Sequence, residues 1–548
     1  MSEILKVKEL SVKYSDFELH PLSFELQEGG ILAIIGESGS GKTTLAKAIS
    51  CLLSKEARSS GEVYIDDHEL LSMDEKERKA LRLTSFSIAF QNSAQWLNPT
   101  MTLKSHLQEV LDRSMKREEQ EKRMKELMEE VGLSASDLTR FPKELSGGMA
   151  QKFLLANAIA LNPKLVILDE PTSSTDSRSR NEFIKLIRRL NHEKGIAFLI
   201  ITHDLGIAAE LSTQTIVLYA GHIVEFGKTE ELLNNPRHPY TRGLINASIC
   251  LNLAKDIWGI RQERHTGKRT GCPFCGRCTQ SLPSCSECAP QLETAVGGRK
   301  IACNRGGIIT VLSCQGISKS YGKQRIFEEL NLEIFSGEIV SLVGKSGIGK
   351  TTLARILSGF DDNYEGTPIK FLSEKADFKL LHRSKQGVQM VFQDSEASLN
   401  PHISVFDAVS EPLVLSRSGE VRESVDRALL DVGLSCNELF LQKKITELSG
   451  GMKQRVSIAR ALTMEPTILI ADEPTSMLDP SSSANLIRML KQLQNSHGFS
   501  MLVITHDIEC ALKISDRIYL LEKSGLKRLA PASFICTNIG EIFEEEFN

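Results

Sequence analysis

The stretch Ile31–Thr44, with the sequence ILAIIGESGSGKTT, constrains the fold of this chain more than any other. Its first five residues are all apolar, and such a run predicts a buried strand of a parallel sheet. The run breaks at Gly36 into a glycine-rich loop, and a helical pattern follows from Leu45 to Leu53. A strand, a glycine loop and a helix in this order direct backbone N–H groups and the positive end of the helix at one point, which suits a bound phosphate.

The loop has the spacing G-x-x-x-x-G-K-[ST], which predicts a nucleotide site. Lys42 can reach the β- and γ-phosphates, and the hydroxyl of Thr43 can bind Mg²⁺. The predicted phosphate-binding residues are Gly36, Ser38, Gly39, Ser40, Gly41, Lys42, Thr43 and Thr44.

The same pattern occurs a second time, where the apolar residues Val340–Val343 lead into a second glycine loop. Its predicted phosphate-binding residues are Gly344, Ser346, Gly347, Ile348, Gly349, Lys350, Thr351 and Thr352. Other features keep one register, since Ser146 and Ser449, Asp169 and Asp472, and His203 and His506 are each 303 positions apart. The chain is therefore predicted to contain an internal repeat of one domain.

Each copy carries four further polar features in the same order. A glutamine, Gln91 or Gln393, ends an apolar run and could meet Mg²⁺ or the attacking water. A serine and two glycines then open a helix and leave N–H groups for an anion: Ser146, Gly147 and Gly148, or Ser449, Gly450 and Gly451.

A buried strand in each copy ends in Asp-Glu, and the next strand ends in histidine. Buried strands seldom end in paired carboxylates for stability, because desolvated charge is costly. Asp169 is placed to hold Mg²⁺ and Glu170 to polarise water, and Asp472 and Glu473 repeat the pair. Tyr14, in a turn between two alternating strands, could stack on adenine or could equally be a core or turn tyrosine.

Composition sets limits on the class of protein. The chain has 548 residues, 41% of them apolar, and its net charge of −4 gives no global bias toward nucleic acid. No run of 18 or more apolar residues occurs, so no segment is expected to span a membrane. The stretch MSEILKVKEL lacks an apolar signal region, which favours the cytoplasm.

Six of the twelve cysteines fall between Cys272 and Cys303, in GCPFCGRCTQSLPSCSEC and KIAC. Twelve cysteines in a cytoplasmic chain argue against a disulfide scaffold. The paired spacings Cys272/Cys275 and Cys285/Cys288 could hold zinc, and four thiolates suit either Zn²⁺ or an iron–sulfur cluster. Clustered thiols without a metal are the remaining alternative.

These repeated motifs resemble those of the ATP-binding cassette (ABC) ATPases, and the resemblance covers nearly the whole chain. LSGGMAQK and LSGGMKQR look like the signature of that family, and LVILDEPTSSTD and ILIADEPTSMLD look like its Walker B and D-loop stretches. The resemblance implies an α/β fold with two tandem ABC-type P-loop nucleotide-binding domains, each with a β layer and a helical subdomain, joined by a small Cys-rich segment. We expect the domains at 1–235 and 307–548, with the extension and linker at 236–306.

The resemblance also implies roles for individual residues. Two composite ATP sites would form, one from Gly36–Thr44 with Ser449–Gly451 and one from Gly344–Thr352 with Ser146–Gly148. Glu170 and Glu473 would be general bases, and His203 and His506 would contact the γ-phosphate. Asp176 and Asp479 would be D-loop residues, Tyr14 and Tyr321 would contact the nucleotide, and Thr43, Gln91, Thr351 and Gln393 would serve Mg²⁺.

A narrower resemblance is to the ATPases of dipeptide, oligopeptide and nickel importers. It rests on Gln91 followed by Leu97-Asn98-Pro99, on Gln393 followed by Leu399-Asn400-Pro401, and on Arg237-His238-Pro239-Tyr240-Thr241-Arg242. It implies a [4Fe–4S] cluster on Cys272, Cys278, Cys285 and Cys303, with zinc as the alternative.

An importer ATPase would lie at the cytoplasmic face of the membrane as a peripheral protein. The resemblance implies two integral membrane permease subunits and an extracytoplasmic solute-binding protein as partners, and no nucleic acid. The substrate would be a short peptide, a nickel complex or a similar small solute. The alternative is a soluble tandem-cassette ATPase that acts on ribosomes or DNA.

Overall fold

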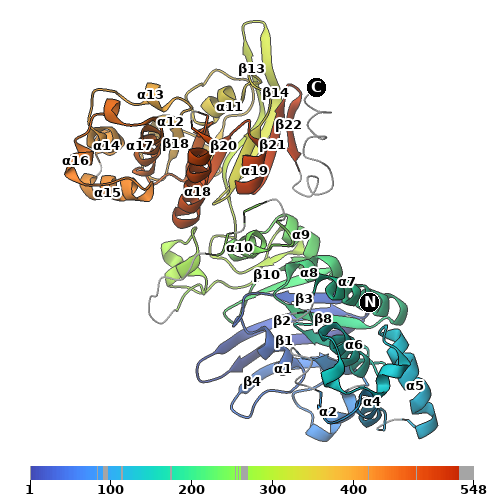
Figure 1. The fold of residues 1–548 in the computed structure, drawn as a ribbon. Helices are drawn as coiled ribbons and strands as arrows, with labels where there is room; N and C mark the ends of the chain where they lie inside the picture. The colour runs from blue at the N-terminus through green and yellow to red at the C-terminus, as the bar shows by residue number, and fades with distance from the viewer. Residues whose placement is uncertain are drawn as a thin grey trace. The chain divides into compact units, whose positions relative to one another are not determined.

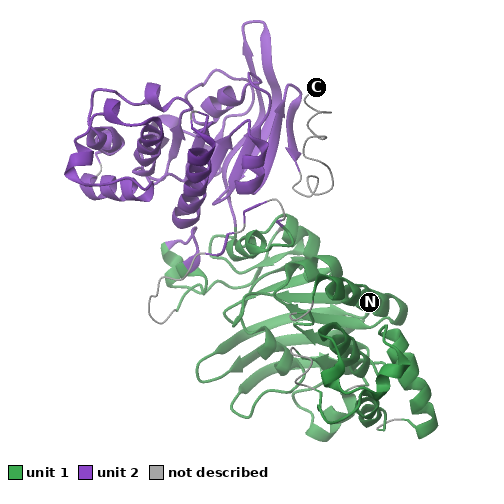
Figure 2. Cartoon of the chain, viewed as in Figure 1, with its two compact units in different colours: residues 1–251, 265–276, 283–307 green, residues 252–264, 277–282, 308–548 purple. Residues whose placement is uncertain are grey.

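The structure is a computed structural model that describes residues 2–82, 84–90, 97–112, 115–172, 176–252, 255–256, 258–260, 270–417, 419–476 and 478–529. The chain divides into two compact units (Figure 2). The first comprises Met1–Leu251, His265–Gly276 and Pro283–Gly307, and the second Asn252–Arg264, Arg277–Leu282 and Ile308–Asn548. Each unit contains one copy of the predicted repeat.

The first unit is built on an antiparallel sheet and a mostly parallel sheet (Figure 1). The antiparallel sheet has the strand order β2-β1-β4-β5, and the larger sheet has the order β11-β12-β10-β9-β3-β8-β7-β6. Strands β9, β3, β8, β7 and β6 run parallel to one another. The strands are β1 Glu3–Lys13, β2 Glu18–Gln27, β3 Ile31–Ile35, β4 Arg58–Ile65, β5 His68–Glu69, β6 Phe86–Ala89, β7 Leu165–Asp169, β8 Ala197–Thr202, β9 Gln214–Tyr219, β10 His222–Lys228, β11 Glu293–Thr294 and β12 Lys300–Ile301.

Helices cover the parallel sheet and also form a separate lobe. The helices are α1 Lys42–Ile49, α2 Glu75–Leu81, α4 Leu103–Leu111, α5 Arg117–Glu130, α6 Gly147–Ala158, α7 Ser177–Lys194, α8 Leu205–Leu211, α9 Thr229–Asn234 and α10 Pro239–Ala247. Helices α4, α5 and α6 pack on one another through apolar residues such as Leu107, Met124 and Phe153. This lobe corresponds to the helical subdomain that the family resemblance implies.

The second unit repeats the plan. Its antiparallel sheet has the order β14-β13-β16-β17, and its larger sheet has the order β18-β19-β20-β15-β21-β22. The strands are β13 Thr310–Tyr321, β14 Gln324–Phe335, β15 Ile339–Val343, β16 Lys370–Phe371, β17 Glu374–Lys375, β18 Val388–Val391, β19 Ile468–Asp472, β20 Ser500–Ile504, β21 Arg517–Glu522 and β22 Gly525–Leu529. The helices are α11 Lys350–Leu357, α12 Phe378–Leu381, α13 Ser395–Ser398, α14 Val405–Leu415, α15 Val421–Asp431, α16 Glu438–Leu441, α17 Gly450–Leu462, α18 Pro480–His497 and α19 Ile508–Ile514.

Apolar runs explain why the central strands form where they do. Strands β3, β7 and β8 are buried over their whole length, as are β15, β19 and β20. Strands covered on both faces require such runs, and their carboxyl ends meet at one edge of the sheet, where ligands of α/β folds bind. Among the described residues, we find no helix with the length and apolar character needed to cross a bilayer.

One local expectation is wrong, because α1 ends at Ile49 and not at Leu53. The hydroxyl of Ser50 donates to the carbonyl of Ala46 at 2.7 Å, and Cys51 then takes a positive φ of 54°. A left-handed residue cannot continue a right-handed helix, so the chain turns there toward β4.

Candidate functional site

The first glycine loop links β3 to α1 in a conformation that excludes side chains at two positions. A Cβ at Gly36 would lie 2.2 Å from the carbonyl oxygen of Leu218 in β9. Gly41 has a φ of 104°, and a Cβ there would lie 2.8 Å from the ring of Phe17. The neighbouring strand and the Phe17 ring therefore dictate these glycines.

The lysine of each glycine loop folds back over that loop. In the first unit, Lys42 Nζ donates to the carbonyl of Gly36 at 2.8 Å and to that of Glu37 at 2.9 Å. In the second, Lys350 Nζ donates to the carbonyls of Gly344 and Lys345 at 2.9 and 3.1 Å.

Burial lowers the pKa of both lysines, while nearby acidic groups oppose that shift. For Lys42 these acids are Glu170, Asp169 and Glu37, and for Lys350 they are Glu473 and Asp472. Each glycine loop therefore holds a desolvated ammonium group that gains from an added anionic charge.

A threonine hydroxyl and a buried carboxylate meet beside each lysine. Asp169 at the end of β7 is hydrogen-bonded to Thr43, and its Oδ1 atom is buried without a hydrogen-bond partner among the described residues. In the second unit, Thr351 Oγ1 donates to Asp472 Oδ1 at 3.3 Å.

Burial raises the pKa of both Asp169 and Asp472. A bound cation would supply the opposite charge that such a carboxylate needs, and Mg²⁺ prefers oxygen ligands of this kind. The residues present therefore fit a magnesium ion.

A glutamate and a histidine lie next to each Thr–Asp pair. Glu170 and Glu473 directly follow β7 and β19 and take positive φ values of 51° and 43°. Their backbone N–H groups donate to the carbonyls of Ile201 and Ile504, which fixes this strained geometry.

The glutamate carboxylates contact the histidines that follow the neighbouring strands. His203 Nδ1 lies 2.7 Å from Glu170 Oε2, and His506 Nδ1 lies 3.5 Å from Glu473 Oε1. In the second unit, Gln393 Nε2 also donates to Glu473 Oε2 at 2.9 Å. The corresponding Gln91 lies outside the described residues.

The two Ser-Gly-Gly motifs begin helices, as the sequence predicts. The hydroxyl of Ser146 accepts from Met149 N–H at 3.3 Å at the start of α6, and Ser449 accepts from Met452 N–H at 3.4 Å at the start of α17. Asp176 and Asp479 similarly cap α7 and α18. A capped helix start presents free backbone N–H groups, which is the chemistry of an anion site.

The two tyrosines expected to contact the nucleotide differ. Tyr14 is half-buried against the core below the antiparallel sheet. Tyr321 is 53% exposed, its hydroxyl donates to Asp361 at 3.3 Å, and Lys319 Nζ lies 4.8 Å from its ring centroid. Stacking on adenine stays a prediction for both residues.

Comparison with known proteins identifies the family. The sequence profile described as ABC transporter matches residues 19–173 and 327–476, and that of the oligopeptide/dipeptide transporter C-terminal region matches residues 224–285. The oligopeptide transport ATP-binding protein OppD of Mycobacterium bovis is 32% identical, over 95% of this chain and 94% of that protein. The glutathione import ATP-binding protein GsiA of Escherichia coli O157:H7 is 31% identical, over 98% of this chain and 87% of that protein. The chain belongs to the ABC transporter ATPases.

This ABC ATPase hydrolyses ATP and contains two cassettes. The region that matches the C-terminal region of oligopeptide and dipeptide transporters lies between the two cassette matches, at residues 224–285. The resemblance deduced from the signature and Walker B stretches is confirmed. The individual roles of the residues above stay predictions.

The cysteine-rich segment of this ABC ATPase was expected to bind a metal centre, and that expectation stays a prediction. Among the described residues, no group of three or more His, Cys, Asp or Glu side chains is arranged to hold a metal ion. The backbone N–H of Cys272 donates to the backbone carbonyl of Cys285 at 2.8 Å, which brings these two parts of the segment together. Burial raises the pKa of the Cys272 thiol to about 11, and Cys285, Cys303 and Cys275 add to this shift.

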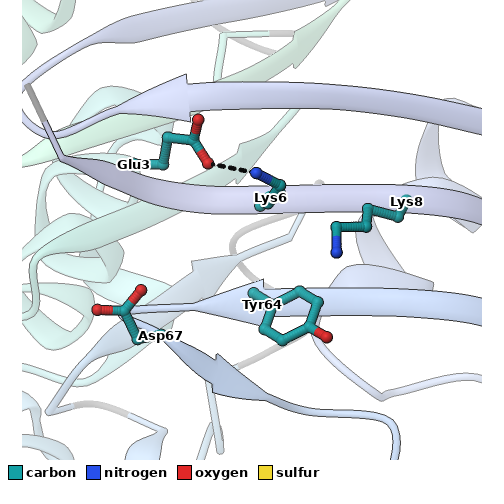
Figure 3. A pocket seen from close by; sticks show the side chains of 5 residues that line it. All are labelled: Glu3, Lys6, Lys8, Tyr64 and Asp67. Atoms are coloured by element: carbon teal, nitrogen blue, oxygen red, sulfur yellow. Dashed lines mark hydrogen bonds and ion pairs between the residues drawn. The ribbon is translucent and has the colours of Figure 1, made fainter.

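A polar pocket lies on the antiparallel sheet of the first cassette (Figure 3). Its lining residues are Glu3, Lys6, Lys8, Tyr64 and Asp67, none of which is predicted to contact ATP. Lys6 pairs with Glu3 at 2.9 Å and Lys8 with Glu62 at 3.2 Å, so these ammonium groups already have partners. The pocket therefore shares no lining residue with the predicted ATP sites.

Two contacts of the first glycine loop were not predicted. Phe17 packs against Gly41, and the backbone N–H of Glu37 donates to the hydroxyl of Tyr240 at 2.8 Å. Tyr240 is 203 positions from Glu37, and no spacing rule links residues so far apart in the sequence. Only the fold brings them together.

Proposed function

We propose that this ABC ATPase energises the import of short peptides, glutathione among them, through a membrane transporter. The observation that carries the proposal is that both cassettes assemble the same set of lysine, Thr–Asp pair and Glu–His pair. The names of the two relatives supply the substrate class, because OppD is an oligopeptide transport protein and GsiA a glutathione import protein. These names favour peptides over nickel complexes.

Each set of residues suits the hydrolysis of a γ-phosphate. Water attacks the γ-phosphorus, the bond to the bridging oxygen breaks, and ADP and phosphate leave. Glu170 and Glu473 orient this water and accept its proton, while His203 and His506 hold the γ-phosphate. Lys42 and Lys350 neutralise the phosphate oxygens.

Magnesium fits beside the lysines. The ion would be held by Thr43 and Asp169 in the first cassette and by Thr351 and Asp472 in the second. Gln91 and Gln393 would be further ligands. When bound, the ion screens the charge on the phosphate oxygens.

Each ATP would be shared between the two cassettes. We pair Gly36–Thr44 with Ser449–Gly451, and Gly344–Thr352 with Ser146–Gly148. The capped starts of α17 and α6 support a phosphate-binding role for the two Ser-Gly-Gly motifs, because backbone N–H groups at a helix start can bind phosphate oxygens. Closure around two ATP molecules and reopening after hydrolysis would drive the transporter.

The proposed assembly contains two integral membrane permease subunits and an extracytoplasmic solute-binding protein. The ATPase would lie at the cytoplasmic face of the membrane as a peripheral subunit. The segments after Gln91 and Gln393, up to Pro99 and Pro401, would contact the permease subunits.

A [4Fe–4S] cluster on Cys272, Cys278, Cys285 and Cys303 is a further proposal, with zinc as the alternative. The proximity of Cys272 to Cys285 and Cys303 supports it. Anaerobic purification followed by metal analysis and visible absorption spectroscopy tests it. Iron with equimolar sulfide, lost in the Cys272→Ser variant, is the expected result, and a metal-free chain would contradict it.

The main test is a mild-detergent pull-down of the tagged chain from its own membranes, followed by ATPase and peptide-uptake assays. We expect two multi-spanning proteins to co-purify, and uptake to fail in the double variant Glu170→Gln, Glu473→Gln. An uptake defect specific to nickel would overturn the peptide assignment. Recovery of ribosomes or DNA without a membrane partner would overturn the importer function and favour the soluble ATPase.

A further inference from the structure

Tyr240 links the segment after the first cassette to the first glycine loop. It lies on α10, is fully buried, and its hydroxyl accepts a hydrogen bond from the backbone N–H of Glu37 at 2.8 Å. The peptide group that carries this N–H also carries the carbonyl of Gly36, which accepts from Lys42 Nζ at 2.8 Å. One peptide group of the loop is thus held at its N–H by Tyr240 and at its C=O by Lys42.

Buried polar contacts fix the start of α10 and so the position of Tyr240. The carboxylate of Glu225 is fully buried and accepts from the N–H groups of Arg237 and His238, both at 2.9 Å. The guanidinium of Arg299 donates to the same carboxylate at 3.3 Å. His238 Nδ1 then accepts from the N–H of Tyr240 at 3.1 Å, which caps the helix.

The ring of Tyr240 is held by aromatic neighbours, one of which belongs to the cysteine-rich segment. Its centroid lies 4.6 Å from that of Tyr219 and 5.4 Å from that of Phe274. Phe274 is 3% exposed, also contacts Tyr219 and His238, and follows Cys272 by two positions. The cysteine-rich segment therefore packs directly on the side chain that holds the loop.

We propose that Tyr240 is a positioning residue that sets the ATP affinity of the first glycine loop, and that Phe274 holds Tyr240 in place. The cysteine-rich segment thereby controls one of the two ATP sites. The inference rests on the proposed role of Gly36–Thr44 in phosphate binding. A loop whose peptide group is already oriented loses less conformational entropy when phosphate binds, so the contact favours binding. In the printed sequence the HPYT motif occurs once, at His238–Thr241 after the first cassette, so the inference concerns the first loop.

The test uses the full chain with one loop disabled at a time. In a Lys350→Ala background, ATP binding reports the first loop, and in a Lys42→Ala background it reports the second. We expect Tyr240→Phe to raise the Kd of a fluorescent ATP analogue roughly two- to tenfold in the first background, as for the loss of one neutral hydrogen bond. Phe274→Leu should act in the same direction, and neither variant should change the Kd in the second background.

Two controls separate positioning from general damage. Tyr64→Phe removes a hydroxyl that donates to Glu62 at 3.1 Å on the antiparallel sheet. Tyr64 is not among the residues predicted to bind ATP, so this variant should leave the Kd unchanged. Turnover in the first background should show a raised KM with little change in kcat. An unchanged Kd in Tyr240→Phe, or an equal change in both backgrounds, would overturn the inference. Failure of the Lys42→Ala, Lys350→Ala double variant to abolish binding would instead overturn the loop assignment.

Discussion

At the scale of residues, the two ATP sites are similar but not identical. Glu170 has a side-chain exposure of 10% and lies 2.7 Å from His203, while Glu473 has an exposure of 18% and lies 3.5 Å from His506. The carboxylate of Glu473 also accepts from Gln393. The two predicted general bases therefore differ in exposure and in their distance from the neighbouring histidine.

Burial makes His238 a source of acid sensitivity in the first unit. The residue is 2% exposed, and burial lowers its pKa from 6.5 to about 3. Between these values the unfolded chain binds a proton that the native chain does not. The contribution of His238 to the free energy of unfolding is therefore greatest above pH 6.5. It decreases as the pH falls toward 3, by up to about 1.4 kcal/mol per pH unit.

His238→Asn tests this effect, because an amide oxygen can still cap α10 but does not titrate. We expect the free energy of unfolding, measured with urea at neutral and mildly acidic pH, to fall less steeply with decreasing pH in the variant. His192→Asn, on the exposed last turn of α7, is the matched control and should leave the slope unchanged. Equal slopes in His238→Asn and the wild type would contradict the explanation.

At the scale of elements, the unit of β3, glycine loop and α1 is shaped by what packs around it. Gly36 approaches β9 too closely for a side chain, whereas a Cβ at Gly39 would have no atom within 4 Å. Both glycines belong to the same motif, but only the first is required by its neighbours. Gly39 is required by its own φ of 79°, which disfavours other residues.

We therefore expect Gly36→Ala to lower the stability of the first unit more than Gly39→Ala does. The second substitution should cost about 1–2 kcal/mol, the penalty for a left-handed non-glycine residue. The first should cost more, because the 2.2 Å contact with the Leu218 carbonyl forces β9 and the loop apart. Urea unfolding measures both, and an equal or larger effect of Gly39→Ala would contradict this ranking.

At the scale of the whole molecule, one chain contains two compact units with matching sites. The proposed composite sites make the cassettes depend on each other, since each glycine loop would need the Ser-Gly-Gly motif of the other cassette. Groups that act as a unit give effects that are far from additive. Loss of one site should therefore affect both.

Lys42→Ala and Lys350→Ala test this dependence. We expect each single variant to reduce ATP turnover to less than roughly a fifth of the wild-type rate, because closure needs both nucleotides. The substitution Lys185→Ala, at an exposed position of α7, serves as the control and should retain turnover. Steady-state ATPase assays measure all three variants, and a residual rate near one half in each loop variant would indicate independent sites.

Features that depend on local order along the chain follow from the sequence alone. A buried strand, a glycine loop and a helix follow from adjacent residues, and the 303-residue register revealed the repeat without any structure. Parallel strands bring their carboxyl ends to one edge of the sheet. The sequence therefore also predicts that Thr43 lies near Asp169 and Glu170 near His203, as the structure has them. The family followed from the same motifs.

The distant residues that support the first glycine loop could be identified only from the way the chain packs. Three contacts join segments that share no periodicity in the sequence. They are the hydrogen bond between Tyr240 and Glu37, the bond from His238 N–H to the buried Glu225, and the packing of Phe274 on Tyr240. Among the described residues, no group of three or more His, Cys, Asp or Glu side chains is arranged to hold a metal ion, so the cluster stays a prediction. Spacing indicates which ligands a segment offers, but whether thiols converge depends on packing, which no local pattern encodes.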